Sequence, residues 1–388
     1  MDKALKSPST LYQYPLSKTT TMSEENINFY QIRNLPNQEE KEKALQIIIK
    51  RAQEKNDIDL EYQARTEYMQ AVAFTNQPEK SLACFPWLLA INDKNPGKYY
   101  LWEVLWYYKW VVNEVANFPS ITKQRIEDIM EDMERRYVAA GYGTKTIVYF
   151  WRRIYQDFGE PKLAQAAHEK WEKMEESSSM MSDCNACVRN HLVSHHSYME
   201  EYQEAIDAAQ DLLNKRMTCA EVPKRTYHKV VRAYCYLGKL EEAIPVYRKA
   251  IRNLGHHQSY LQDYSSLLIF LSLTENFTPA KNIFVKQMPY ALVHKQEHDI
   301  QLFYIASLFF LKALLANGRK KIVLPEELKV PVESENRSYQ IDDLIPFFEK
   351  EIDRIANLFN ERNGNDFFSH KKDKALALMK FKRKVALK

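Results

Sequence analysis

Residues 227–251 read YHKVVRAYCYLGKLEEAIPVYRKAI and contain the pattern that decides the fold. Small and aromatic residues recur through this stretch, at Tyr227, Val230, Tyr234, Gly238, Ala243, Tyr247 and Ala250. Alanines in a similar setting follow at nearly constant intervals on both sides. Ala280 lies 37 residues after Ala243, Ala205 lies 38 residues before it, and Ala164 lies a further 41 residues back. The spacing indicates an internal repeat.

The residue types of this repeat resemble a tetratricopeptide repeat. That resemblance implies two antiparallel helices per repeat, which bury their apolar faces by stacking on neighbouring copies. With weaker copies around residues 76–89 and 119–133, we expect an all-α, right-handed α-solenoid of about six helical pairs between residues 40 and 292. The intervals exceed the ~34 residues of the standard repeat, which predicts longer loops or helices.

The composition argues against an α/β enzyme. Only 8 of the 388 residues are glycine, and strand signals are scarce. The stretch Gly141–Thr146 lacks the spacing of a phosphate loop. His294–His298 matches the H-x-x-E-H pattern of some zinc peptidases, but it lies at a helix entrance with no evident third ligand. We therefore expect a protein that is not an enzyme.

Four segments are expected along the chain. Residues 1–25 hold Pro, Ser and Thr without an apolar run, which predicts a disordered leader, no signal peptide and a cytoplasmic location. The solenoid is expected over residues 26–295. Capping helices are expected over residues 296–365, interrupted by an irregular loop at 320–338 and closed by an amphipathic helix over 341–362. Residues 366–388 form a basic tail.

The tail accounts for the basic charge of the chain. Residues 370–388 contain eight Lys or Arg residues and one Asp, which gives them a net charge of +7. The whole chain carries only +4, so the rest of the chain is acidic. Apolar residues interleave with these cations, which fits contact with nucleic acid or an acidic membrane. The alternative is a solvated, partly helical terminus that maintains solubility.

Three of the five cysteines are placed to converge. Cys184 and Cys187 form a C-x2-C pair at an expected helix start, and Cys219 lies at the corresponding place before the next helical pair. In a stacked array these positions are neighbours, so the three sulfurs are candidate ligands of a structural zinc ion. The fourth ligand is open, with candidates at Asp183, His191 and His195. The alternatives are small buried side chains between repeats and a redox-active Cys187–Cys219 pair.

A narrower resemblance rests on three stretches. They are LWEVLWYYKW and DMERRY within residues 101–137, Ser182-Asp183-Cys184, and TCAEVP at residues 218–223. Together they are similar to a family of uncharacterised bacterial tetratricopeptide-repeat proteins that share Asp-Cys-x-x-Cys and Cys-x-x-x-Pro elements. The similarity covers residues 80–295. It implies the fold, and it implies no particular activity.

Two sets of residues are candidates for a ligand-binding groove. The first is an aromatic run on one expected helix, at Trp102, Trp106, Tyr107 and Trp110. Aromatic side chains supply large contact area for a peptide, although packing between helices also accounts for them. The second set is Arg135, Arg136, Arg152 and Arg153. Guanidinium groups that face a groove bind carboxylates by paired hydrogen bonds, whereas solvated arginines pair with surface Glu residues.

The sequence therefore predicts a non-enzymatic scaffold that binds a protein or peptide in its concave groove. The main alternative is a peptide-responsive bacterial signalling regulator, in which a bound peptide changes the shape of the solenoid. A zinc- or thiol-dependent enzyme is a third class. Apart from the candidate zinc ion, no cofactor is expected.

Overall fold

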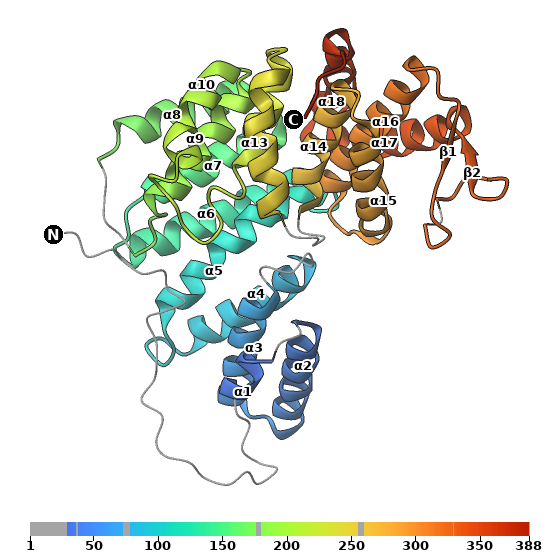
Figure 1. Ribbon diagram of the computed structural model, residues 1–388. Coiled ribbons are helices and arrows are strands. Elements are labelled where there is room, and N and C mark those ends of the chain that lie inside the picture. The colour runs from blue at the N-terminus through green and yellow to red at the C-terminus, as the bar shows by residue number, and fades with distance from the viewer. Residues whose placement is uncertain are drawn as a thin grey trace. The chain divides into compact units, whose positions relative to one another are not determined.

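The computed structural model describes residues 29–35, 38–72, 78–175, 180–254, 260–328 and 330–387, and it is all-α (Figure 1). These residues contain 18 α-helices and one pair of three-residue strands. The leader expected over residues 1–25 lies outside the described residues. The chain divides into two compact units, Met1–Ala71 and Val72–Lys388.

The first unit holds three helices, which are α1 (Phe29–Arg33), α2 (Gln38–Lys55) and nearly all of α3 (Ile58–Val72). Glu39 and Glu40 lie in the first turn of α2, where their carboxylates interact favourably with the helix dipole. The helix buries Leu45, Ile48 and Ala52, which recur at three- and four-residue steps and so share one face.

The second unit begins with helices joined mostly by short loops. They are α4 (Pro78–Lys94), α5 (Leu101–Glu114), the 3-10 helix η2 (Val115–Asn117), α6 (Lys123–Ala139), α7 (Lys145–Phe158), α8 (Pro161–Lys173), α9 (Asn185–Tyr198), α10 (Tyr202–Ala208) and α11 (Gln210–Leu213).

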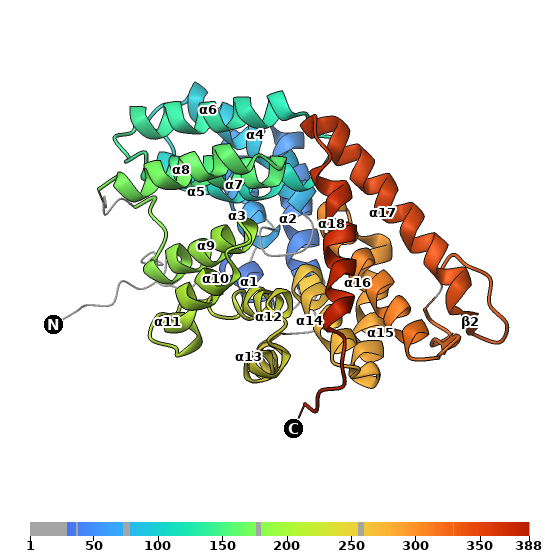
Figure 2. The ribbon, with the colours of Figure 1, turned by 90° about the horizontal axis from the view of Figure 1, so that it is seen from above.

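The unit continues with α12 (Tyr227–Tyr236), α13 (Leu240–Asn253), α14 (Leu261–Leu273), α15 (Phe277–Val293) and α16 (Glu297–Ala316). Consecutive helices pack in pairs, among them α7 with α8, α9 with α10, α12 with α13, and α14 with α15. The first helices of neighbouring pairs also touch, because α12 contacts both α9 and α14, and α14 contacts α16 (Figure 2).

The alanines that anchor the sequence pattern belong to the second helices of four pairs. Ala164 of α8, Ala205 of α10, Ala243 of α13 and Ala280 of α15 are all fully buried. A methyl group lets two helices approach closely, whereas a longer side chain would strain so tight a contact. All four alanines thus lie where helices pack closely.

Glycine makes the turn inside two of these pairs. Gly159 ends α7 with a φ of +74°, and Gly238 follows α12 with a φ of +68°. Residues with a Cβ pay a steric cost in this left-handed conformation, so glycine is the favoured residue after a helix end.

The α16 helix is long and apolar enough to cross a membrane by length and composition. Its side chains are largely buried within the protein, where the helix packs against α14 and α17 (Ile341–Asn363). Internal packing therefore accounts for its apolar composition.

The irregular loop expected at residues 320–338 is bounded by a short strand pair, which the sequence did not predict. Strand β1 (Lys321–Val323) pairs antiparallel with β2 (Ser338–Gln340), and the buried Ile322 lies opposite the buried Tyr339. Three residues are too few to show the alternation that identifies a strand in a sequence.

Residues 366–388, expected to form a basic tail, are instead folded onto the second unit up to the last described residue, 387 (Figure 2). Helix α18 (Phe367–Leu376) packs on α16 and α17, and the following 3-10 helix η4 (Ala377–Phe381) packs on α12 and α14. Leu378 and Val385 are buried. The backbone N–H groups of Arg383 and Val385 donate to the carbonyls of Leu273 and Thr274, at 3.0 and 3.2 Å. The interleaved apolar residues are therefore packing residues.

Several cations of this C-terminal segment form ion pairs with acidic residues of the preceding helical pairs. The Nζ atoms of Lys374 and Lys382 lie 2.6 Å from carboxylate oxygens of Glu200 and Glu275. Arg383 pairs with Glu241 at the same distance. These cations thus form ion pairs within the chain, and of the three pairs only Lys382–Glu275 is largely buried.

Candidate functional site

A pocket of about 740 Å³ lies in the second unit. Most of its lining comes from α4, α5, α7, α9, α12, α14 and α16, and α18 supplies a further wall. The lining is rich in polar and charged side chains. The pocket is therefore the main candidate for a binding site.

Helix α12 and the residues before it give the pocket a basic face. Arg225, Lys229 and Arg232 are separated by four and three residues, a spacing that places side chains on one side of a helix. Arg225 donates to Oδ2 of Asp263 at 3.0 Å, and its guanidinium lies 4.4 Å from the ring centre of Tyr260. Arg225 is thus already neutralised.

Lys229 is surrounded by neutral acceptors and other cations. Its Nζ donates to Oδ1 of Asn190 at 3.2 Å and to Oγ of Ser194 at 2.6 Å. Burial lowers the pKa of Lys229 to about 7, and the charges of Arg153, Arg232 and Arg225 lower it further, against the opposing effect of Asp263. Burial is thus the main cause of the shift, and the neighbouring arginines add to it.

Helix α18 adds a cation from the other side of the pocket. The Nζ of Lys371 lies 3.4 Å from the ring centre of Phe368. Burial lowers the pKa of Lys371 to about 7, and the charge of Arg232 acts in the same direction, while Asp157 opposes it. Within the described part of the chain, Lys229, Arg232 and Lys371 form no ion pair.

The acidic residues of the pocket are mostly occupied by its own bases. Asp263 accepts from Arg225 and lies 3.6 Å from Nε2 of His228. Asp299 lies between His294 and His298, 3.9 and 3.1 Å from their ring nitrogens. Burial raises the pKa of Asp263 to about 6, against the opposing effect of Arg225. Lining charges without a Lys–carboxylate or Arg–carboxylate ion pair among the described residues include Lys229, Arg232 and Lys371 on the positive side, and Glu114 and Asp299 on the negative side.

Aromatic side chains complete the lining. They come from different helices and include Trp110, Tyr149, Tyr236, Tyr260 and Phe367. Aromatic faces and edges offer contact area to an extended chain at little cost in side-chain entropy.

The structure brings only part of the predicted groove set to this pocket. Trp110 and Arg153 line it. Arg153 donates to Oδ1 and to the backbone carbonyl of Asn113, at 2.7 and 3.1 Å. Arg152 contributes to the wall but is 2 % exposed, and its guanidinium hydrogen-bonds Nδ1 of His168 at 2.8 Å.

The other predicted groove residues lie elsewhere. Trp102, Trp106 and Tyr107 are not among the residues that line the pocket. Tyr107 is buried, and Lys109 lies over the ring of Trp106 at 4.0 Å. Arg135 and Arg136 pair with Asp132 on their own helix, and Arg136 also donates to Asp93 at 2.8 Å. These two arginines were predicted as carboxylate receptors for a ligand, but the chain's own acids satisfy them.

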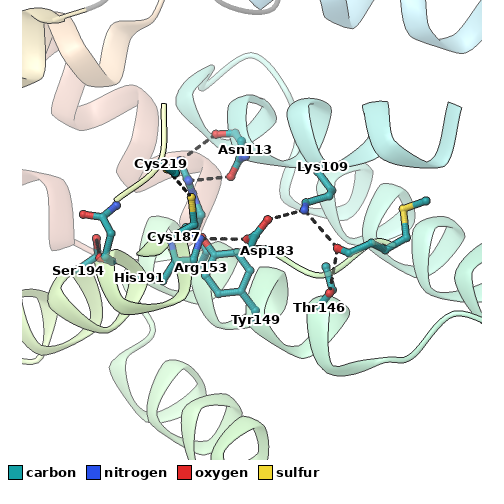
Figure 3. Close-up of polar contacts among 12 residues, drawn as sticks. Lys109, Asn113, Thr146, Tyr149, Arg153, Asp183, Cys187, His191, Ser194 and Cys219 are labelled. Carbon is teal, nitrogen blue, oxygen red and sulfur yellow. Dashed lines mark hydrogen bonds and ion pairs between the residues drawn. The ribbon is translucent and has the colours of Figure 1, made fainter. Parts of the chain in front are cut away.

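The three predicted cysteines do converge. The sulfurs of Cys184, Cys187 and Cys219 lie within 4.8 Å of one another. Those of Cys187 and Cys219, drawn in Figure 3, are 3.6 Å apart. Hydrogen bonding from Cys187 lowers the pKa of Cys184 to about 5, and the pKa of Cys187 is raised in turn. No other group of three or more potential metal ligands among the described residues has its ligand atoms this close to one another.

None of the proposed fourth ligands is free to join the cluster. Asp183 forms an ion pair with Lys109 and lies 3.1 Å from Nε2 of His191 (Figure 3). With Nε2 donating to Asp183, Nδ1 of His191 accepts from the Tyr149 hydroxyl at 2.8 Å. His195 hydrogen-bonds Gln156 and Gln165 through its two nitrogens.

Sequence reasoning missed the basic residues Arg225, Lys229, Arg232 and Lys371. The sequence did contain a pattern for the first three. Positions 225, 229, 232 and 236 are separated by four, three and four residues, which is the spacing of side chains on one face of a helix. Lys371 carried no comparable signal, since it was counted among the cations of a solvated tail.

Comparison with known proteins identifies no relative, because neither a protein-family model nor a curated protein matches this sequence.

Proposed function

We propose that the helical pairs form a right-handed α-solenoid of the tetratricopeptide type, and that the protein is a non-enzymatic scaffold in the cytoplasm. Its pocket holds an acidic segment of a partner protein. One observation carries this proposal, which is that Lys229, Arg232 and Lys371 reach the same pocket without a carboxylate partner among the described residues.

The energetics favour an anionic occupant. A buried charge without a counter-charge is costly, and the lowered pKa values of Lys229 and Lys371 express that cost. Carboxylates of a bound segment would supply the missing counter-charges and would restore both lysines to their charged form. Arg232 and the neighbouring Arg153 offer planar donors suited to the same groups.

The pocket's size and lining favour a peptide segment over an isolated ion. Its volume of about 740 Å³ is within the range of sites that enclose whole ligands. Side chains from many helices reach it, among them α5, α7, α9, α12, α14 and α16, so an extended chain would meet recurring polar and aromatic contacts. Trp110 and Tyr260 are examples of such contacts from separate helices.

A second function, a peptide-responsive regulator, is favoured by the position of α18. This helix supplies Phe367 and Lys371 to the pocket, and the segment that follows it is tied to other helices through Lys382 and Arg383. A ligand that binds Lys371 would therefore act on the C-terminal segment. Faster or slower hydrogen exchange of residues 377–387 on ligand binding would support this regulator, and unchanged exchange would support a passive scaffold.

The test of the binding proposal uses a labelled oligoglutamate peptide, with an oligolysine peptide of the same length as the charge control. Lys229→Gln together with Arg232→Gln should weaken oligoglutamate binding by about 2 kcal/mol or more, roughly 30-fold, because both charges are desolvated in the complex. Arg135→Gln is the matched control, since Arg135 lies outside the pocket and is 73 % exposed. Preference for oligolysine, or equal losses in both variants, would refute the proposal.

A further inference from the structure

We propose that Cys184, Cys187 and Cys219 bind one zinc ion through three sulfurs and leave its fourth coordination position open to solvent or to an external ligand. The three cysteines do not line the pocket described above, so this site is independent of the proposed binding function.

The sulfur geometry fits the ion. Zinc bonds to thiolate sulfur at ~2.3 Å, and tetrahedral coordination then separates two sulfurs by ~3.8 Å. The sulfurs of Cys187 and Cys219 are 3.6 Å apart, and all three sulfurs lie within 4.8 Å of one another. Small side-chain rotations therefore suffice to bring the third sulfur to a coordinating position.

Local backbone structure brings the three cysteines together. Cys184 is the N-cap of α9, and Cys187 lies one turn into the same helix, so their side chains meet at the helix start. Cys219 comes from the segment between α11 and α12, where its N–H donates to the carbonyl of Val222 at 2.9 Å. Ala186, Leu212 and Val222 form a small apolar base on which Cys187 and Cys219 pack.

The cluster differs from three cysteines that merely fill a core. Cys184 is exposed, and Cys187 and Cys219 are half-buried, whereas Cys235 elsewhere in the unit is fully enclosed. The sulfurs therefore remain accessible to an ion from solution. Because Asp183 and His191 are bound to other groups, the described residues supply three ligands, the number typical of zinc sites with an open position.

A bound ion would join the start of α9 to the segment before α12, and thereby two successive helical pairs. The three thiols lose their protons on coordination, and these protons pass to solvent. No change of oxidation state is involved, which distinguishes the site from a Cys187–Cys219 disulfide that would require an external oxidant.

The test uses the full chain, reduced and stripped of metal, and then titrated with ZnCl₂ or with CoCl₂ as a spectroscopic substitute. We expect one zinc ion per chain after gel filtration and release of protons on binding. The cobalt form should show intense sulfur-to-cobalt charge transfer. Zinc should also protect three thiols from a thiol reagent.

Cys184→Ser, Cys187→Ser and Cys219→Ser should each reduce bound zinc and charge-transfer intensity without loss of helical circular dichroism. Cys235→Ala is the control and should bind one zinc ion. The proposal fails if the reduced wild-type chain retains no zinc, or if a variant lacking all three cysteines retains as much as the wild type. It also fails if added zinc changes neither the reactivity of these thiols nor their oxidation to a Cys187–Cys219 disulfide.

Discussion

Phe367 packs so closely over Gly159 that a Cβ added to the glycine would lie 2.5 Å from the Cβ of Phe367. Gly238 has a similar relationship with Phe381, whose ring would lie 2.9 Å from an added Cβ. The C-terminal segment therefore rests on the turns of two helical pairs, and those turns must be free of side chains.

Gly159→Ala is expected to destabilise the protein more than Gly97→Ala. Both glycines have a positive φ, +74° and +80°, so both substitutions carry the left-handed strain of about 1 kcal/mol. Nothing lies within 4 Å of a Cβ at Gly97, whereas the clash with Phe367 adds about 1–3 kcal/mol at Gly159. Urea unfolding of the two variants measures the difference, and equal losses would mean that α18 does not pack on this turn.

Lys382→Ala is expected to loosen the C-terminal segment. The Lys382–Glu275 pair is largely buried, with side chains 14 % and 20 % exposed. Removal of the lysine leaves Glu275 without its ion-pair partner, which should lower the free energy of unfolding by about 1–3 kcal/mol. Amide hydrogen exchange at Arg383 and Val385 should accelerate. Lys384→Ala is the control because Lys384 is exposed, and equally fast exchange in both variants would contradict the role of the ion pair.

Affinity for an acidic peptide is expected to fall as the pH rises from about 6 to 9. Lys229 and Lys371 have pKa values lowered to about 7, so both are charged below that pH and neutral above it. The pKa of Asp263 is raised to about 6, so this carboxyl gains negative charge on the alkaline side and acts in the same direction. The charged groups that act on Lys229 are Arg153 of α7, Asp263 of α14, Arg232 of its own helix and Arg225, which precedes that helix.

Fluorescence anisotropy across this pH range tests the direction. In Lys229→Gln the pH dependence should be reduced, because Lys371 and Asp263 are the titrating groups that remain. An affinity that rises with pH in the wild type would show that these lysines do not contact the peptide's carboxylates.

Arg152→Ala is expected to cost about 2–4 kcal/mol of stability, because it removes a buried side chain and its hydrogen bond to His168. The same change at Arg135, which is 73 % exposed, should alter stability by less than about 0.5 kcal/mol. Thermal unfolding separates the two. If Arg152→Ala were as stable as Arg135→Ala, the buried position of Arg152 would be wrong.

Helix contacts were predictable from the sequence where packing restricts residue type. Ala243 and Gly238 are such positions, because one allows close helix contact and the other allows a left-handed turn. Pocket residues were less predictable, since successive residues on a helix differ by about 100° in direction. Arg152 and Arg153 are adjacent, yet one is bound to His168 and the other to Asn113.

The C-terminal segment shows a second reason for failure. Its lysines dominate the charge count, but its fold is determined by Leu378 and Val385, which require a surface formed by helices far earlier in the chain. Such long-range contacts leave no local pattern. The cysteine cluster was predictable because C-x2-C spacing fixes two sulfurs on one helix start, and the stacking of helical pairs supplied the third.

Ala164→Glu is expected to destabilise the protein by about 3 kcal/mol or more, because it forces an unpaired charge into the fully buried contact between α8 and α7. Ala166→Glu is the matched control, two residues further along the same helix, where the side chain is exposed and glutamate is well tolerated in a helix. Urea unfolding followed by circular dichroism should separate the two variants clearly. Equal stabilities would place Ala164 outside the contact between the paired helices, and the alanine-centred repeat would then lose its structural basis.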